Sequence, residues 1–201
     1  MMKRVRRAGV LGGIAMFAWS SITHMVLPLG EIGIKEIPNE QAVLGAMQSQ
    51  IGGSSGLYLF PGMGLPPDAT HAQKSAAMQQ YEQKLASHPS GLLLYHPPGA
   101  KGMSMGLLVT ELLTELVESL LVVVLLAETR LTAFGGRVGF VAVAGVLSAT
   151  TTNFPYWNWY RFPTNYTIAY MVIEIVGFLC VGIVAALTMR GQAAKSLAAT
   201  T

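Results

Sequence analysis

Four apolar stretches constrain this 201-residue chain more than any other feature of its sequence. They span residues 8–29, 103–127, 138–154 and 164–189, and a helix needs roughly 20 such residues to cross a bilayer. Hydrophobic residues make up 52% of the chain and charged residues 11%, which is unusual for a soluble domain. The sequence therefore predicts a mainly α-helical integral membrane protein with four transmembrane helices. The third stretch is the shortest, because Pro155 follows it.

Basic residues at the ends of these stretches predict their orientation, because lysine and arginine collect on the cytoplasmic side of a membrane. The segment MMKRVRR precedes the first stretch and no A-x-A cleavage site follows, which predicts a retained anchor. We therefore expect both termini in the cytoplasm and residues 30–101 in the periplasm. The basic residues that would share the cytoplasmic side are Lys3, Arg4, Arg6, Arg7, Arg130, Arg137, Arg190 and Lys195.

The same charges argue against a nucleic-acid partner. The formal net charge is +3, and the basic residues are scattered along the chain and form no basic face. The single cysteine, Cys180, can build neither an internal disulfide nor a cysteine metal cluster. The expected partners are the lipid bilayer and other membrane-protein subunits.

Residues 30–101 are more polar and predict a small domain inserted between the first two membrane helices. SSGLYLFPG (54–62) and PSGLLLYHPPG (89–99) are short apolar runs bounded by turn residues, which is typical of β-strands. A helix-like stretch precedes each run, at 39–50 and 68–87, so we expect the order αβαβ. The expected domains are 1–29, the basic N terminus with the first membrane helix; 30–101, the extracytoplasmic domain; and 102–201, the other three membrane helices and a short cytoplasmic C terminus.

Three glutamates interrupt the second apolar stretch. Glu111, Glu115 and Glu118 fall within about 60° of one another on a helix, so they form one stripe. Insertion into a bilayer costs roughly 2.5–3.5 kcal/mol per charged residue at mid-helix, or about 7–10 for three. The fourteen leucines and valines between residues 107 and 126 return only about 4–8 kcal/mol. We therefore expect neighbouring helices to shield the stripe from lipid.

Three other side chains are expected to face this stripe: His24 from the first stretch, and Tyr170 and Glu174 from the fourth. No lysine or arginine is expected at the same depth, so the chain cannot neutralise its own glutamates. Two hypotheses follow. The protein is an accessory or structural subunit of a larger membrane complex, docking through the second helix and the extracytoplasmic domain. Alternatively, it translocates protons or cations through a bundle lined with glutamates. Enzyme activity has no positive support, because no catalytic motif is present.

An aromatic run separates the third and fourth stretches. Its residues Tyr156, Trp157, Trp159 and Tyr160 predict a belt at the level of the lipid headgroups. A stacking platform for a quinone, carotenoid or sugar is the alternative. No cofactor is predicted, although a bound lipid, quinone or pigment is compatible with these residues.

A copper site outside the membrane is the weakest metal hypothesis, because methionine and histidine in turns are more often packing and turn residues. Its candidate ligands are His71, His88, His96, Met103 and Met105.

Small residues spaced four apart predict close helix packing. The pairs are Gly9 with Gly13, Gly135 with Gly139, and Gly145 with Ala149.

The segments SSITHMVLPLGEIGIKEIPNE (20–40), GLYLFPG (56–62) and YWNWYRFPTNYTIAY (156–170) occur in an order that resembles a group of small bacterial membrane proteins with four spans. The resemblance implies a location in the bacterial inner membrane. It implies no activity.

Overall fold

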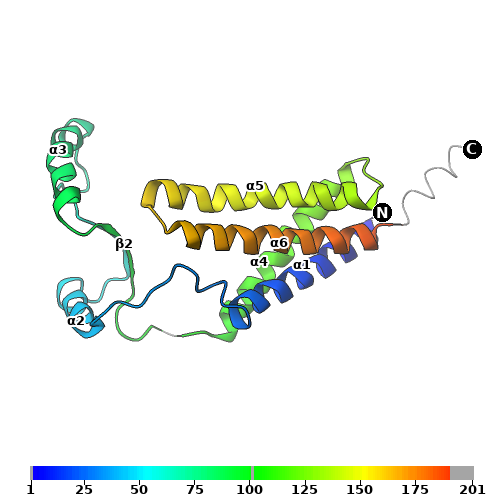
Figure 1. The fold of residues 1–201 in the computed structure, drawn as a ribbon, viewed down its shortest axis with the longest axis horizontal. Coiled ribbons are helices and arrows are strands. Elements are labelled where there is room, and N and C mark those ends of the chain that lie inside the picture. The colour runs from blue at the N-terminus through cyan, green and yellow to red at the C-terminus, as the bar shows by residue number, and fades with distance from the viewer. Residues whose placement is uncertain (1, 101, 191–201) are drawn as a thin grey trace, which may run out of the picture. The chain divides into compact units, whose positions relative to one another are not determined.

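The computed structural model describes residues 2–100 and 102–190, which form a mainly helical structure with a small two-stranded sheet. The chain divides into two compact units. One runs up to Ile34 and resumes at Met103, and the other is Lys35–Gly102. The elements in Figure 1 are α1 (Met2–Met25), α2 (Glu40–Gln50), β1 (Gly56–Phe60), α3 (His71–Ser87), β2 (Gly91–Tyr95), α4 (Met105–Glu128), α5 (Phe134–Tyr160) and α6 (Thr164–Thr188).

Helices α5 and α6 are long and apolar enough to cross a membrane, with mean hydropathies of 1.3 and 2.4 over their most apolar windows. Helices α1 and α4 are nearly as long, with 24 residues each. Helix α4 carries four glutamates, however, and α1 begins inside the basic N-terminal segment. Of the four expected spans, length and composition therefore support two.

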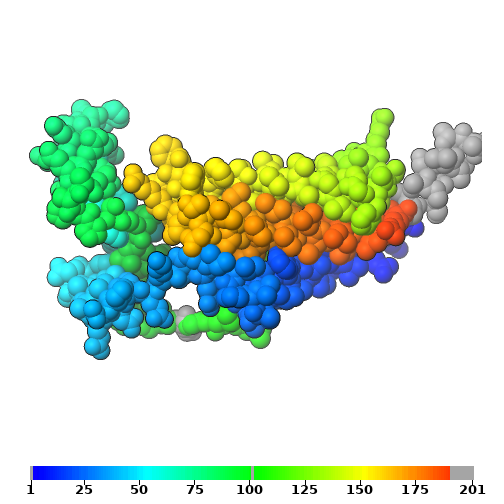
Figure 2. Space-filling model, in the orientation of Figure 1, coloured from blue at the N-terminus to red at the C-terminus, as the bar shows by residue number. Residues whose placement is uncertain are grey.

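The four long helices form an antiparallel bundle in which α1 packs against both α4 and α6, and α6 packs against α5. Gly9 lies opposite Leu120 and Gly13 opposite Leu116, so α1 and α4 run in opposite directions. Figure 2 shows α5, α6 and α1 as adjacent bands. Helix α4 touches α5 and α6 over only a few residues, so these helices do not close a ring. The start of α1 and the end of α6 lie at the same end of the bundle (Figure 1).

Glycines set the distance between these helices. A Cβ at Gly13 would lie 2.8 Å from the Cα atom of Leu116, so α1 and α4 approach within the space of a missing methyl group. A Cβ at Gly145 would likewise lie too close to the Phe178 side chain of α6. Ala149, which is paired with Gly145 by its spacing of four residues, is fully buried. Gly139 has no neighbour that a Cβ would meet. Two of the three small-residue pairs therefore face helix contacts.

The bundle has a dry half and a polar half. The dry half, near the start of α1, packs Val5, Val123, Leu126, Val181 and other apolar side chains. The boundary between the halves lies at Ser119, whose hydroxyl donates a 2.8 Å hydrogen bond to the carbonyl of Gly9.

The outer surface of the bundle is apolar as well. Ile14 of α1, Leu113 of α4, Val143 of α5 and Ile168 of α6 are all at least half exposed. On α4, the exposed leucines and valines lie on the face opposite buried Glu115.

Helix α5 continues past Pro155 to Tyr160, so the expectation that this span ends at residue 154 is wrong. Proline removes one backbone donor and crowds the carbonyl four residues earlier, at Thr151. Thr151 is exposed, which leaves room for that carbonyl to tilt outward. The helix ends instead at Arg161, which has a left-handed backbone conformation (φ 56°) and precedes Pro163 by two residues.

The Lys35–Gly102 unit has the element order αβαβ. Strands β1 and β2 are antiparallel, with Gly56 paired to Tyr95 and Phe60 to Gly91. Helix α3 begins at a capping box, in which Thr70 and Gln73 satisfy each other's backbone amides. Helices α2 and α3 contain no buried residue. This unit is therefore held mainly by its sheet and by a few polar bonds, such as that from the Tyr95 hydroxyl to the Gly52 carbonyl.

Replacing Gly13 by alanine should destabilise the bundle. The added methyl group would meet the backbone of α4, and overpacking of this kind costs about 1–3 kcal/mol. The matched control is Gly139→Ala, which should leave stability unchanged or raise it by up to about 1 kcal/mol through helix propensity. Thermal unfolding in detergent, followed by tryptophan fluorescence, compares the two. Equal stability of both variants would contradict the close α1–α4 contact.

Candidate functional site

A cavity of about 310 Å³ lies in the polar half of the bundle. All four long helices contribute to it, mostly through residues one helical turn apart, which share a helix face. Its lining comprises Met16, Trp19, Ser20 and His24 of α1; Glu111, Thr114, Glu115 and Glu118 of α4; Ser148 and Thr152 of α5; and Tyr170, Ile173, Glu174 and Gly177 of α6.

Glu115 is the most buried acidic residue of the cavity, with 5% of its surface exposed. Its Oε2 atom is buried and has no hydrogen-bond partner. Glu111, one turn earlier, is exposed, and Glu118 is half-buried. Exposure along the stripe thus falls from Glu111 to Glu115 and rises again at Glu118. A buried carboxylate oxygen without a donor among the described residues is costly when the group is charged.

Glu174 occupies the opposite wall, and each oxygen of its carboxylate accepts a hydrogen bond. The Ser148 hydroxyl donates a short hydrogen bond to Oε1, and the Asn153 amide donates to Oε2 at 3.2 Å. Asn153 also donates to the Ala149 carbonyl, which fixes its side chain along α5. Helix α5 therefore holds this carboxylate in place. Glu118 lies close enough to Glu174 for the two charges to repel each other.

Aromatic side chains of α1 and α6 line part of the cavity. The Trp19 indole N–H donates to the Ile173 carbonyl at 2.9 Å, which anchors the ring between α1 and α6. The Tyr170 hydroxyl donates to the Gly30 carbonyl at 3.3 Å, and the Tyr170 ring stacks on Tyr166 with centroids 4.3 Å apart. The His24 ring meets Tyr170 edge-on. These contacts connect the aromatic side chains of α1 and α6 to neighbouring parts of the same unit.

Four carboxyl groups line the cavity, and no lysine or arginine is among its lining residues. The buried basic residue Arg137 lies in the first turn of α5, toward the dry half of the bundle, and donates to the Leu131 carbonyl. Apart from His24, the ionisable side chains of the lining can carry only negative charge, which favours a cation when they are ionised.

The structure brings all six residues of the expected partner- or ion-binding group to this one cavity: Glu111, Glu115, Glu118, Glu174, Tyr170 and His24. Sequence reasoning missed three residues of the cavity walls, Trp19, Ser20 and Ser148, and also Asn153, which donates to Glu174. A signal for two of them was present. The SATTTN segment of α5 (148–153) contains Ser148 and Asn153 and is a polar run in an otherwise apolar helix.

The aromatic run forms the last turn of α5. Tyr156, Trp157, Trp159 and Tyr160 are all exposed, and the Trp157 indole donates to the Thr164 hydroxyl at 3.1 Å. Tyr156 also packs against Phe162, which contacts Tyr166. A row of aromatic rings thus connects the end of α5 with the aromatic side chains that line part of the cavity.

The candidate copper ligands His71 and His88 are not brought together within the Lys35–Gly102 unit. His71 begins α3 and His88 follows its last residue, so about 25 Å of helix separates them. His96 follows β2, and Met103 and Met105 are exposed at the start of α4. Among residues 2–100 and 102–190, no group of three histidine, cysteine, aspartate or glutamate side chains is placed to hold a metal ion.

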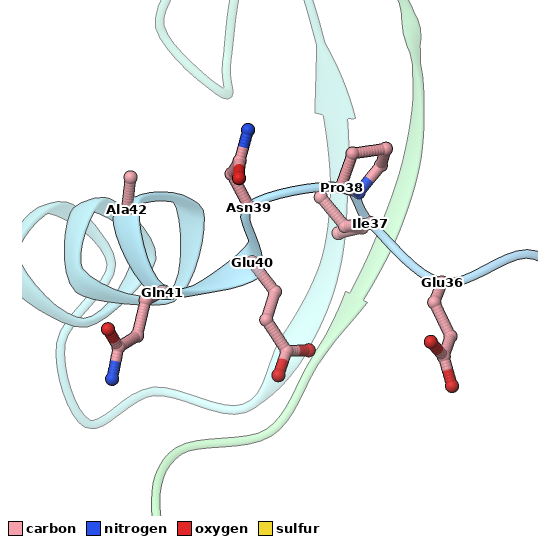
Figure 3. A pocket seen from close by; sticks show the side chains of 7 residues that line it. All are labelled: Glu36, Ile37, Pro38, Asn39, Glu40, Gln41 and Ala42. Atoms are coloured by element: carbon pink, nitrogen blue, oxygen red, sulfur yellow. The ribbon is translucent and has the colours of Figure 1, made fainter.

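A second, open hollow lies in the Lys35–Gly102 unit and is lined by residues 36–42 (Figure 3). Glu36 and Glu40 point to the same side of the chain there, and all seven residues are exposed. Because one continuous segment forms this hollow and no second element faces it, it is a surface feature of the turn into α2.

Comparison with known proteins adds no identification, since no family model, curated protein or solved structure matches the chain.

Ser148→Ala, which removes the Ser148 hydroxyl, should destabilise the bundle by about 1.5–3 kcal/mol, because the Glu174 carboxylate would lose a charge-assisted hydrogen bond. Thr151→Ala is the matched control on α5, since the Thr151 hydroxyl bonds only to its own helix backbone and the residue is exposed. It should change stability by less than about 0.5 kcal/mol. Thermal unfolding measures both variants, and an equal loss in the two would show that Ser148 does not support Glu174.

Proposed function

We propose that this protein is an integral protein of the bacterial inner membrane whose four-helix bundle binds and conducts a proton or cation through its acidic cavity. The placement of side chains on α4 supports insertion of all four helices. Leu113, Val117 and Leu121 face outward, while Glu115 and Ser119 face inward. This arrangement suits a lipid environment and exposes apolar area at a cost in water.

The proposed orientation follows from the antiparallel bundle. Lys3 and Arg4 at the start of α1, Arg130 after α4, and Arg190 after α6 all belong to the same end of the bundle. We assign that end to the cytoplasm by the positive-inside rule, and the Lys35–Gly102 unit to the periplasm. Lys195 and residues 191–201, which are also expected in the cytoplasm, lie outside the described residues.

The unpartnered oxygen of Glu115 is the observation that carries this proposal. A buried carboxylate persists in a protein when it is protonated, bound to a cation or paired with another group. Lysine and arginine are missing from the cavity lining, which leaves a mobile cation or a proton as the ligand.

The cavity gives such a ligand a defined entrance. Glu111 and His24 are exposed, whereas Glu115 lies deeper, so a cation approaches from the periplasmic end and moves inward. Beyond Ser119, the apolar side chains of Val123, Leu126 and Val181 close the bundle. Passage to the cytoplasm therefore requires a movement of α4, which is the helix with the least contact to α5 and α6.

Liposomes that contain the purified protein test this function. Wild-type protein should dissipate an imposed proton or potassium gradient faster than empty liposomes, as recorded with an enclosed dye. Glu115→Gln should lower the flux about tenfold or more, because it removes a charged acceptor worth roughly 1.5–3 kcal/mol. Glu128→Gln is the control, since Glu128 is an exposed residue of α4 that does not line the cavity. A wild-type flux equal to that of empty liposomes would contradict the proposal.

A role as an accessory subunit of a larger membrane complex is the second candidate, and the Lys35–Gly102 unit favours it. Leu57 and Leu59 lie on one face of β1 and are 66% and 56% exposed. Two strands alone are marginally stable, and neither α2 nor α3 contributes a buried residue. A partner subunit that covers this strand face would supply the missing apolar contact.

Purification in mild detergent tests the accessory role. A second polypeptide in stoichiometric amount should accompany the wild-type chain and should be lost in Leu57→Ser with Leu59→Ser. The paired control, Gln79→Ser with Gln83→Ser, changes exposed polar residues of α3 and should retain the partner. A single polypeptide of uniform size in both preparations would argue against this role.

A further inference from the structure

Basic side chains gather at the end of the bundle where α1 begins and where α4 and α6 end. Val5, Leu126 and Met189 share one apolar cluster, so these three helix ends meet. The described segments at this end, residues 2–10, 126–137 and 184–190, contain one acidic residue, Glu128. Their basic residues are Lys3, Arg4, Arg6, Arg7, Arg130, Arg137 and Arg190, all exposed except Arg137. This end of the bundle therefore carries an excess of positive charge.

The positive charges at the start of α1 repel one another. Lys3 lies three residues before Arg6 and four before Arg7, so these side chains are neighbours on the helix surface. Like charges at this spacing destabilise a helix, and α1 contains no acidic residue that would offset them. Glu128 neutralises at most one of the basic groups at this end. The basic surface of α1 is therefore complementary in charge to an anion from outside the chain.

An apolar strip continues this basic surface along α1. At 100° per residue, four exposed side chains fall within about 60° of one another, namely Lys3, Arg7, Val10 and Ile14. They lie on the face opposite the buried Gly12. Val10 and Ile14 are 42% and 50% exposed, and Ile14 lies about 10 Å along the helix from Arg7. A charged end followed by an apolar strip matches a phospholipid, which has a phosphate at one end and hydrocarbon beyond it.

The corresponding outer face of α4 has the opposite charge. Leu121 and Leu125 are 61% and 58% exposed, and the exposed residue that follows them on the same face is Glu128. This face offers a similar apolar surface but ends in a carboxylate. It therefore suits a neutral lipid better than an anionic one.

We infer that the outer face of α1 binds an anionic phospholipid, whose phosphate pairs with Lys3 and Arg7 and whose acyl chain lies along Val10 and Ile14. Each lysine or arginine near a membrane surface strengthens binding to anionic lipid about fivefold. This inference rests on the proposed insertion of α1 into the membrane, and it does not depend on ion conduction through the acidic cavity.

Native mass spectrometry of the full chain in detergent tests the inference by titration with dioleoyl phosphatidylglycerol or dioleoyl phosphatidylcholine. The two lipids have the same acyl chains and differ in headgroup charge. Phosphatidylglycerol should bind about tenfold or more tightly, since two basic groups contribute, and the difference should shrink at high salt. Inorganic phosphate should not displace it at equal concentration, because phosphate makes no contact with the apolar strip.

Variants locate the site on α1. Lys3→Gln with Arg7→Gln should weaken phosphatidylglycerol binding about tenfold or more and leave phosphatidylcholine binding unchanged. Lys3→Arg with Arg7→Lys keeps both charges and should bind as the wild type does. Lys74→Gln removes an exposed lysine of the polar helix α3 and should also leave binding unchanged. Glu128→Lys should add one tight site for phosphatidylglycerol, because the outer face of α4 then carries a cation beside its leucines.

Equal affinity of the wild type for the two lipids would overturn the inference. Displacement by inorganic phosphate would assign the basic surface to a soluble anion. Loss of an accompanying polypeptide from Lys3→Gln with Arg7→Gln, at unchanged lipid affinity, would assign it to an acidic protein partner. Each of these results leaves the proposed function standing where the protein still conducts ions in liposomes. A chain that stays soluble without detergent and binds neither lipid would reject both the inference and the proposed function.

Discussion

The bundle depends on keeping carboxylates away from lipid. Three glutamates on α4 make that helix a poor membrane span by itself, and the structure compensates by turning them toward α1, α5 and α6. The leucines and valines of the opposite face then point outward. Helix α4 thereby presents apolar side chains to the exterior and polar side chains to the interior of the bundle. The cavity is the consequence, because charged side chains cannot be packed together as tightly as the apolar core near the start of α1.

Helix α1 makes this arrangement possible. Its small residues Gly9, Gly12 and Gly13 allow α4 and α6 to approach it closely. Beyond these glycines, the larger Met16 and Trp19 hold α1 and α6 apart at the level of the cavity. The change from small to large residues along one helix therefore places the boundary between the closed and the open half of the bundle. Ser119, bonded to the Gly9 carbonyl, lies at that boundary.

The two walls of the cavity differ in the hydrogen-bond donors that they supply to their carboxylates. Helix α5 supplies two donors to Glu174 and fixes it, so this residue belongs to the structure of the wall. Glu115 lies in a comparable position on α4 but its second oxygen has no donor. A buried carboxylate oxygen without a donor is costly, so the surroundings of Glu115 stabilise its charge less than those of Glu174 do.

Local patterns in the sequence were sufficient for the long helices, for the αβαβ order of residues 40–95, and for the single face shared by Glu111, Glu115 and Glu118. Each of these depends on spacing along one helix or strand, which the sequence states directly. Tertiary structure alone decided that Ser148 and Asn153 hold Glu174, that Glu115 keeps a free oxygen, and that α5 continues through Pro155. These features depend on how closely particular helices approach and on which residues meet across the gap. Contacts at the glycines of α1 and α5 determine both the distance between the helices and the residues that meet across it. No periodicity within a single helix contains that information.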